Sequence, residues 1–453
     1  MASGTNLLST PPPKAPSSAL AAAGVYTPSA DWKVTPSKPQ AVLNVGSTST
    51  AQSLAHLFST HSIPLDVQRD SAVRFGRDSR VCLLDKTHLL PFQLNMEGYL
   101  REKFYSMLPI EEAHFFDDGY SAFGHGFSER NLETAKEDAI QARIRYRWGK
   151  TCIEGGNCRI FVGKDGRPKA LVGYHSLLLS YLALEQAGYF RDNEERVEKL
   201  AHRIDYPQED SYRVARNLLL TKQQYEKRER YSSKDKILSK PTEPHKYYEL
   251  ALEFEAKLRM TKEKIAEELG IPEDQIAFLT QENFHIDLEV FAGPEDVVFV
   301  HDEESAISII EERQKKGERE RPILESYLKN AHSRLDRSLA MRAKNQKAIE
   351  SIGCRVVRVA GDFIGPQSEH RINFMNGLFL NDRHKPHFIT NGTPSTSLNH
   401  YIKSEFLERI EAASPQLKVL FVDDQNARLP RSLGDAHGGV NCMTWIGGST
   451  TAD

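Results

Sequence analysis

The chain has 453 residues, of which 27% are charged and 39% belong to the hydrophobic set, and its formal net charge is -3. These proportions are ordinary for a globular protein and supply enough apolar side chains for a substantial core. No global positive field is present, so we expect neither a nucleic-acid partner nor binding to an anionic membrane. No apolar run approaches the roughly 18 residues that a membrane span needs.

The cysteine content favours free thiols in a reducing compartment, because five is an odd and low number without framework spacing. Cys152 and Cys158 are separated by five residues, too many for a CxxC unit. The scattered cysteines and the lack of HxxxH spacing predict no metal, and we expect no cofactor. No secretory signal opens the chain, so a cytoplasmic location is expected, with leaderless export as the alternative.

The N-terminal 38 residues are rich in Pro, Ser, Thr and Ala. Few apolar side chains there offset the entropy cost of ordering the backbone, so residues 1–38 are expected to be a disordered leader. The first apolar run, 41–45, begins the folded sequence, and residues 39–445 are expected to form one domain. Residues 446–453 are expected to be a flexible tail.

Short apolar runs and helical spacings alternate along this domain. Strands are expected at 41–45, 73–78, 81–84, 159–163, 276–279, 284–290, 297–300, 355–359, 374–380, 387–390 and 418–422. Helices are expected around 54–58, 94–107, 133–146, 305–351 with a break near Pro322, and 398–411. Residues 177–270 are almost wholly helical, which indicates an insertion between two strand units. The recurring order without a fixed period predicts an α/β or α+β body of several strand units around a shared centre.

A cysteine follows two glycines close to the C-terminal end, in the stretch Gly438-Gly439-Val440-Asn441-Cys442. Glycines let the backbone turn tightly or approach a ligand. A thiol is only a few per cent thiolate at about pH 7 unless a base or a positive field lowers its pKa. Cys442 is therefore either an activated nucleophile or a small buried hydrophobe, as most free cysteines are.

His285 and Asp287 are two residues apart in the expected strand 284–290, so their side chains should share one face. A histidine beside a carboxylate can act as a general base, and the same pair can hold a metal. The alternative is the solvated face of an edge strand.

Two further carboxylates stand next to glycines: Asp78, which follows Gly76-Arg77, and Glu154, which precedes Gly155. Such carboxylates can lie close to a ligand, and a planar cation with several N–H donors suits them best. Each can equally be a turn residue that accepts backbone N–H bonds.

Taken together, these groups favour a thiol that acts on a guanidinium. The carboxylates would hold the cation, and the cysteine would attack its central carbon. The histidine would protonate the leaving amine and then take a proton from water. The positive charge of the substrate would itself lower the pKa of the thiol.

The segments FGRD, EGGN, HID and GGVNCMTW, in this order, resemble the pentein or guanidine-modifying superfamily. It includes arginine, agmatine and peptidylarginine deiminases, dimethylarginine hydrolases and amidinotransferases. The resemblance spans about 41–445 and implies that 39–445 is a catalytic domain, a five-bladed α/β propeller of ββαβ units. Residues 177–270 would be an addition to that core.

The resemblance also implies a role for each motif residue. Cys442 would be the nucleophile and His285 the acid and base. Asp78 and Asp287 would bind the guanidinium, with Arg77 beside them. Glu154 would support or orient the site, and Asn441 stands where relatives often have His or Arg. These residues are the candidate catalytic and substrate-binding set: Cys442, His285, Asp287, Asp78, Glu154, Asn441 and Arg77.

The favoured function is a hydrolase that deiminates arginine or an arginine derivative through a covalent cysteine intermediate and releases ammonia. An amidinotransferase, in which an amine acceptor replaces water, is the first alternative. A catalytically inert binding or regulatory protein is the second, and a metal site at His285 and Asp287 the third. The substrate would be an arginine-like small molecule or an arginyl protein, and the helical insertion would serve macromolecular recognition or a homo-oligomer contact.

Overall fold

The computed structural model describes these residues: 39–44, 56–61, 65–68, 80–82, 87–89, 99–109, 136–137, 146–230, 244–316, 321–363, 372–380, 386–392, 397–422, 440 and 444–448. All of them belong to one compact unit, Val34–Asp453. The expected leader, residues 1–38, lies outside the described part of the chain.

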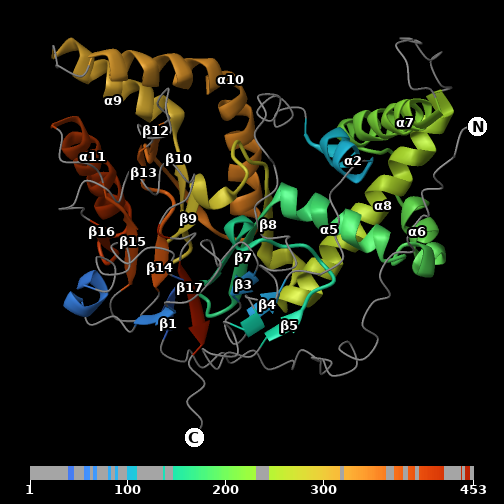
Figure 1. Cartoon of the computed structure of the whole chain (residues 1–453), viewed down its shortest axis with the longest axis horizontal. Coiled ribbons are helices and arrows are strands. Elements are labelled where there is room, and N and C mark those ends of the chain that lie inside the picture. The colour runs from blue at the N-terminus through green and yellow to red at the C-terminus, as the bar shows by residue number, and fades with distance from the viewer. Residues whose placement is uncertain are drawn as a thin grey trace, which may run out of the picture. The chain divides into compact units, whose positions relative to one another are not determined.

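The described strands number seventeen and are labelled in Figure 1. They are β1 (Pro39–Asn44), β2 (Leu65–Gln68), β3 (Arg80–Cys82), β4 (Thr87–Leu89), β5 (Tyr146–Trp148), β6 (Cys158–Val162), β7 (Pro168–Gly173), β8 (Ile276–Leu279), β9 (Val290–Ala292), β10 (Val297–His301), β11 (Arg355–Val359), β12 (Asp362–Phe363), β13 (Ile372–Asn373), β14 (Leu378–Leu380), β15 (His387–Asn391), β16 (Lys418–Val422) and β17 (Thr444–Gly448).

The described helices lie mainly between paired strands. They are α2 (Tyr99–Met107), α5 (Tyr174–Gln186), α6 (Glu194–Ala201), α7 (Glu209–Arg230), α8 (Pro244–Leu269), α9 (Glu303–Lys315), α10 (Arg321–Ser351) and α11 (Ser397–Ala413). Short 3-10 helices include η3 (Gly155–Asn157) and η6 (Ile286–Leu288). The mixed α/β class predicted from the sequence is therefore confirmed.

One sheet pattern occurs five times in the described residues. Each of these sheets has three strands, and its middle strand pairs antiparallel on one side and parallel on the other. The orders are β17-β1-β2, β3-β4-β5, β6-β7-β8, β9-β10-β11 and β14-β15-β16. A helical segment lies in each connection to the parallel strand, since such a connection must cross back along the sheet. Four of these sheets are thus ββαβ units in chain order, and in the fifth the antiparallel strand, β17, comes from the far end of the chain.

The sheet β17-β1-β2 brings together the first and the last of the described strands. β1 pairs with β17, in the register Pro39 to Gly448 and Leu43 to Thr444. The flexible tail predicted for 446–453 is therefore wrong in its first three residues, because the ladder to β1 engages the backbone through Gly448.

The connection from β7 to β8 contains α5, α6, α7 and α8, and so coincides with the helical segment predicted for 177–270. α5 is buried from His175 to Leu184, as expected of a helix that is apolar on all sides. α8 ends at Leu269, the next residue Gly270 has a φ of 66° that suits glycine, and the Ile271 N–H closes the turn on the Ala266 carbonyl. The turn fixes the end of α8, where Glu268 lies.

Local signals also begin the other long helices. Asp302 precedes α9, and its carboxylate accepts the N–H of Ser305. Pro322 stands in the first turn of α10, where its missing N–H costs nothing.

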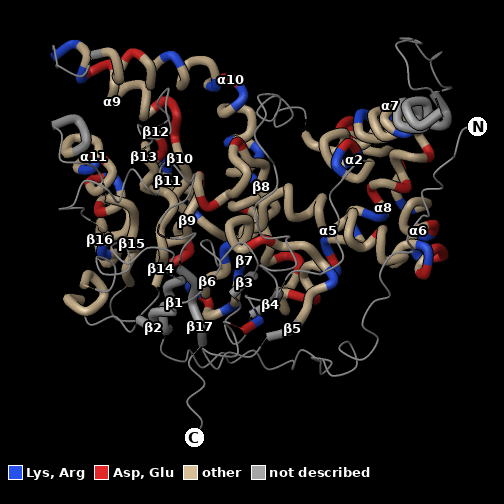
Figure 2. The backbone as a smooth tube through the Cα atoms, viewed as in Figure 1, with Lys and Arg blue, Asp and Glu red and all other residues tan. Residues whose placement is uncertain are grey.

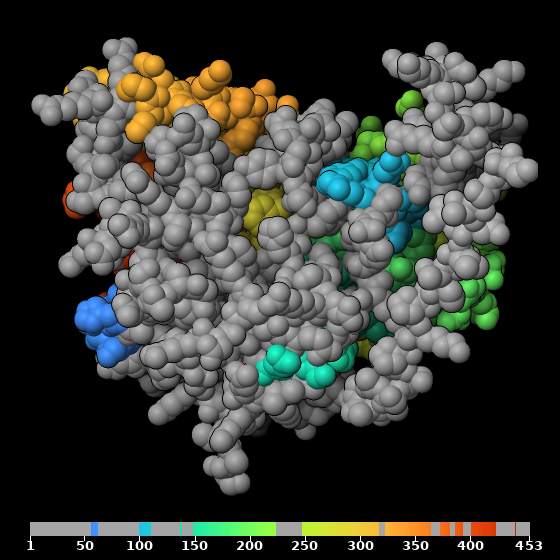
Figure 3. Space-filling view, viewed as in Figure 1, coloured from blue at the N-terminus to red at the C-terminus, as the bar shows by residue number. Residues whose placement is uncertain are grey.

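Figure 2 shows acidic and basic residues interspersed along α9 and α10, as expected of solvated outer faces. Figure 3 shows α2 and the helical segment 56–61 at the surface in this view.

Aromatic packing joins two of the sheets. Phe291 of β9 stacks on Phe388 of β15, with ring centroids 3.8 Å apart, and on Phe299 of β10 at 4.7 Å. All three side chains are buried. A second hydrophobic core contains buried side chains of β6, β7 and β9 together with Ile286, which anchors η6.

No helix within the described ranges is both long and apolar enough to cross a membrane.

Candidate functional site

The segment that carries Glu154 is held from behind by α8. Glu268, near the end of that helix, accepts hydrogen bonds from the backbone N–H groups of Lys150 and Thr151, each at 2.9 Å. Its Oε2 also accepts the Thr151 hydroxyl at 2.5 Å. One buried carboxylate therefore fixes the start of the segment.

α5 holds the next residues of the same segment. Ser180 Oγ accepts the N–H of Cys152 at 2.9 Å, and Ser176 Oγ accepts the N–H of Glu154 at 3.3 Å. All four residues are buried. Buried backbone N–H groups need partners, and two helical serines supply them. The helical region between β7 and β8 is therefore part of what positions Glu154.

Glu154 immediately precedes η3, and its side chain is fully buried. Across from it, His285 Nε2 lies 3.3 Å from Glu154 Oε2, and His285 is equally buried. A Cβ atom at Gly156 would lie 2.2 Å from His285 Nδ1. Only glycine at this position lets the imidazole approach so closely.

His285 and Asp287 do not lie on a strand. His285 has extended backbone angles (φ -133°, ψ 138°), and Ile286–Leu288 forms η6. The predicted strand 284–290 is wrong for all but its last residue, because the N–H groups of Leu288 and Glu289 donate to the carbonyls of His285 and Ile286 within a 3-10 turn and β9 begins only at Val290. The edge-strand alternative, with both side chains solvated, is excluded by the full burial of His285 and Asp287.

Asn157 links η3 to the His285 segment and is a residue that sequence reasoning missed. Its Nδ2 donates to Glu154 Oε2 (3.2 Å) and to the Phe284 carbonyl (3.0 Å). Its Oδ1 accepts from Gln281 Nε2 (2.9 Å) and from the Ile286 N–H (3.1 Å). The fourth letter of EGGN was the available signal, and the buried Gln281 offered none.

Glu289 closes the loop that contains His285 and Asp287. Its Oε1 accepts the N–H groups of Glu282 (2.7 Å) and Asn283 (2.6 Å) and the side-chain amide of Asn283 (3.0 Å). Burial raises the pKa of Glu289 well above its usual value, and the negative charge of Glu282 adds to this. The loop ends are thus tied by one carboxyl group.

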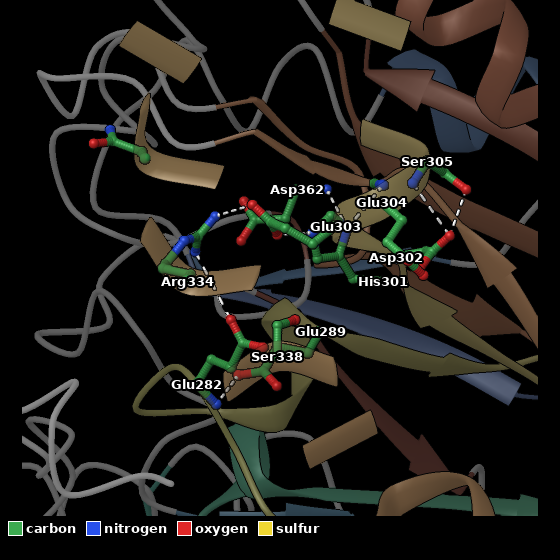
Figure 4. A network of polar contacts seen from close by, with 12 residues as sticks. Glu282, Glu289, His301, Asp302, Glu303, Glu304, Ser305, Arg334, Ser338 and Asp362 are labelled. Carbon is green, nitrogen blue, oxygen red and sulfur yellow. Dashed lines mark hydrogen bonds and ion pairs between the residues drawn. The ribbon is translucent and has the colours of Figure 1, made fainter. Parts of the chain in front are cut away.

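A charged cluster supports Glu282 and Glu289 from the side of α9 and α10, as Figure 4 shows. Arg334 lies between Glu282 and Glu303, with nitrogen–oxygen distances of 4.0 and 2.6 Å. Burial raises the pKa of Glu282. For Glu303, burial acts in the same direction, but the hydrogen bond from His301 and the charge of Arg334 outweigh it and lower the pKa.

His301 is fixed in one tautomer in this cluster. The backbone N–H groups of Gly361 and Asp362 both donate to its Nδ1 at 3.2 Å. Nδ1 is therefore the acceptor, and Nε2 carries the proton that is donated to Glu303 at 2.7 Å. This histidine is held as a structural donor.

Of the seven site residues predicted from the sequence, Glu154, His285 and Asp287 are described, and all three are fully buried. Arg77, Asp78, Asn441 and Cys442 lie outside the described residues. Near them, the N–H of Val440 donates to Asn391 Oδ1 at 2.9 Å.

The elements next to the four motifs are neighbours. β3, which begins two residues after Asp78, has Cα atoms within 8 Å of η3 and of β17. η3 in turn lies within the same distance of η6. β17 begins two residues after Cys442. Segments far apart in the sequence thus lie next to one another, with β3 beside both η3 and β17.

Three cysteines are free, buried thiols: Cys152, Cys158 and Cys354. Burial raises the pKa of Cys152 well above its usual value, and the negative charge of Glu154 adds to the effect. Cys152, although close to the site, is therefore held as a neutral thiol and makes a poor nucleophile.

No protein-family model matches the chain, and no curated protein matches it in sequence. Among solved structures, the chain aligns with two structures of agmatine deiminase from C. jejuni, one of them a serine-for-cysteine variant with substrate bound. Each comparison has 12% identity and a TM-score of 0.42 and covers 91% of this chain. It covers 95% of the substrate-bound chain and 94% of the other.

Proposed function

We propose that this chain is a hydrolase that deiminates the guanidinium group of arginine or an arginine derivative, through a covalent intermediate on Cys442. The observation that carries the proposal is the buried contact between Glu154 and His285, 3.3 Å apart, with Asp287 in the same short segment. Carboxylates and an imidazole fully removed from solvent suit a cationic substrate and proton transfer.

The steps follow from the properties of these groups. The Cys442 thiolate attacks the central guanidinium carbon, and His285 gives a proton to the departing nitrogen, which leaves as ammonia. The amidino group is then bound to sulfur. His285 next takes a proton from water, the resulting hydroxide attacks the same carbon, and the carbon–sulfur bond breaks. The product is a ureido group, and the free thiolate returns.

The carboxylates act on charge and orientation. Asp78 and Asp287 would accept N–H bonds from the planar cation, which lowers the cost of burying it. Glu154 would hold the imidazole and stabilise its protonated form. Arg77 and Asn441 complete the proposed substrate-binding set. The five three-stranded sheets with their helices would be the blades of a propeller around this site, a proposal that the neighbouring positions of β3, β17, η3 and η6 support.

The test is a product assay with a panel of guanidinium compounds: arginine, agmatine, an N-acylated arginine amide and an arginine-rich protein. Ammonia and ureido product in equal amounts support hydrolysis. Guanidinoacetate formed when glycine is added supports amidino transfer. Intact mass spectrometry of protein quenched during turnover should find an amidino adduct on Cys442. A folded protein that is inert toward the whole panel would instead support the binding or regulatory alternative.

A further inference from the structure

The side-chain amide of Asn157 uses both of its donor hydrogens and both acceptor positions within a fully buried site. We infer that Asn157 is a positioning residue that holds Glu154 in register with His285. The inference deepens the proposed function and depends on it for its catalytic readout. Asn157 itself touches Glu154 and the backbone on either side of His285, and acts through them.

The orientation of this amide follows from its partners. Nδ2 faces two acceptors, Glu154 Oε2 and the Phe284 carbonyl, at 3.2 and 3.0 Å. Oδ1 faces two donors, at 2.9 and 3.1 Å. A flipped amide would bring N–H groups against N–H groups, so one orientation is enforced. A side chain of the same size must carry both a donor and an acceptor to bond all four partners of Asn157.

The two bonds to the backbone bracket His285. The Phe284 carbonyl precedes the imidazole and the Ile286 N–H follows it, so Asn157 fixes the peptide groups on both sides of His285. The same amide bonds the carboxylate that faces the imidazole. One residue therefore sets both partners of the 3.3 Å contact, which come from segments about 130 positions apart.

Gln281 and Gly173 hold Asn157 itself in place. Gln281 donates to Asn157 Oδ1 and to the Asn283 carbonyl, each at 2.9 Å, and accepts the N–H of His175. A Cβ atom at Gly173 would lie 2.3 Å from Gln281 Oε1 and 2.7 Å from Asn157 Oδ1. The two amides thus fit into space that only glycine leaves open.

The test is Asn157→Asp, which keeps the size of the side chain and replaces the donor nitrogen with oxygen. That oxygen faces Glu154 and a carbonyl, so the link between the segments breaks. We expect kcat for the deimination to fall about 10²-fold, since a shift of about 1 Å in a reacting group costs that much. The added negative charge also favours the imidazolium, so the limb of the pH–rate profile that reports His285 should move to higher pH.

Asn345→Asp is the matched control. Asn345 is also buried and bridges two segments, with three hydrogen bonds to Thr280 in the described part of the chain. Its variant should lose comparable thermal stability and keep the pH profile of the wild type. An unmoved profile in Asn157→Asp, or an equal shift in both variants, overturns the positioning role.

Two measurements keep the inference separate from folding and from the proposed function. If Asn157→Asp does not fold, Gln281→Glu replaces it as the test variant. It places an oxygen opposite Asn157 Oδ1 and should shift the pH–rate profile in the same direction. The His285 Cε1–H signal in histidine-labelled protein, assigned by its loss in His285→Gln, should move in Asn157→Asp and stay in Asn345→Asp. That signal requires no turnover. An inactive wild type therefore rejects the proposed function, whereas an unmoved signal rejects the role of Asn157.

Discussion

Replacing Gly156 with alanine tests the Glu154–His285 contact directly. The new Cβ would lie 2.2 Å from His285 Nδ1, 2.5 Å from Cγ and 2.7 Å from Cε1. Because carbon and nitrogen atoms pack at about 3.5 Å, the imidazole must move by more than about 1 Å. The Nε2 to Oε2 distance, now 3.3 Å, then exceeds hydrogen-bond range in most directions of movement. We expect kcat to fall about 10²-fold and the free energy of unfolding by about 1–3 kcal/mol.

The assay pairs initial rates of ammonia release with urea unfolding, and Gly166→Ala is the control. Gly166 has φ of 78°, and nothing lies within 4 Å of a Cβ placed there. Its alanine variant should lose about 1–2 kcal/mol from backbone strain alone, with kcat unchanged. If Gly156→Ala retained full activity while losing stability like the control, the close approach of His285 would have no catalytic role.

The remaining predictions concern the thiol, the segment before Glu154 and the loop closure. Cys442→Ala should abolish turnover while Cys152→Ala retains it, as measured by ammonia release; activity in Cys442→Ala refutes the mechanism. Glu268→Ala should cost about 2–4 kcal/mol in urea unfolding, because three donors, two of them on the buried Thr151, lose a charged acceptor; a loss below about 1 kcal/mol would contradict this. The raised pKa of Glu289 favours folding below the unfolded pKa of about 4.3 and lowers stability as pH rises toward its native pKa. Glu289→Gln should therefore flatten the decline in unfolding free energy measured from pH 4 upward; an unchanged slope would refute this assignment.

The helical region between β7 and β8 contributes directly to the candidate site. The sequence alone favours an added segment for recognition or an oligomer contact, because its length exceeds what a core for a small substrate needs. However, Ser176 and Ser180 of α5 and Glu268 of α8 accept hydrogen bonds from the segment that leads to Glu154. Removal of this entire region would expose those backbone donors. A truncation that probes substrate recognition should therefore leave α5 and α8 intact.

The sequence by itself determined the alternation of strands and helices and the helical character of 177–270. It also predicted that Glu154 and His285 lie close together, and the two side chains are 3.3 Å apart. These features depend on local signals: apolar periodicity, and polar residues beside glycines where the backbone can approach another group closely. Such signals act over a few residues, and tertiary contacts at these positions agree with them.

Only the tertiary structure decided how the polar groups are arranged. The alternation in 284–290 suits a strand, but the backbone of Ile286–Leu288 forms a 3-10 turn, and the Ile286 N–H donates to the side chain of the distant Asn157. Asn157 and Gln281 acquire their roles from partners more than 120 positions away in the sequence. The pairing of β1 with β17 likewise cannot be predicted from the local sequence, because the choice of hydrogen-bond partner across a sheet leaves no periodic signal in either strand.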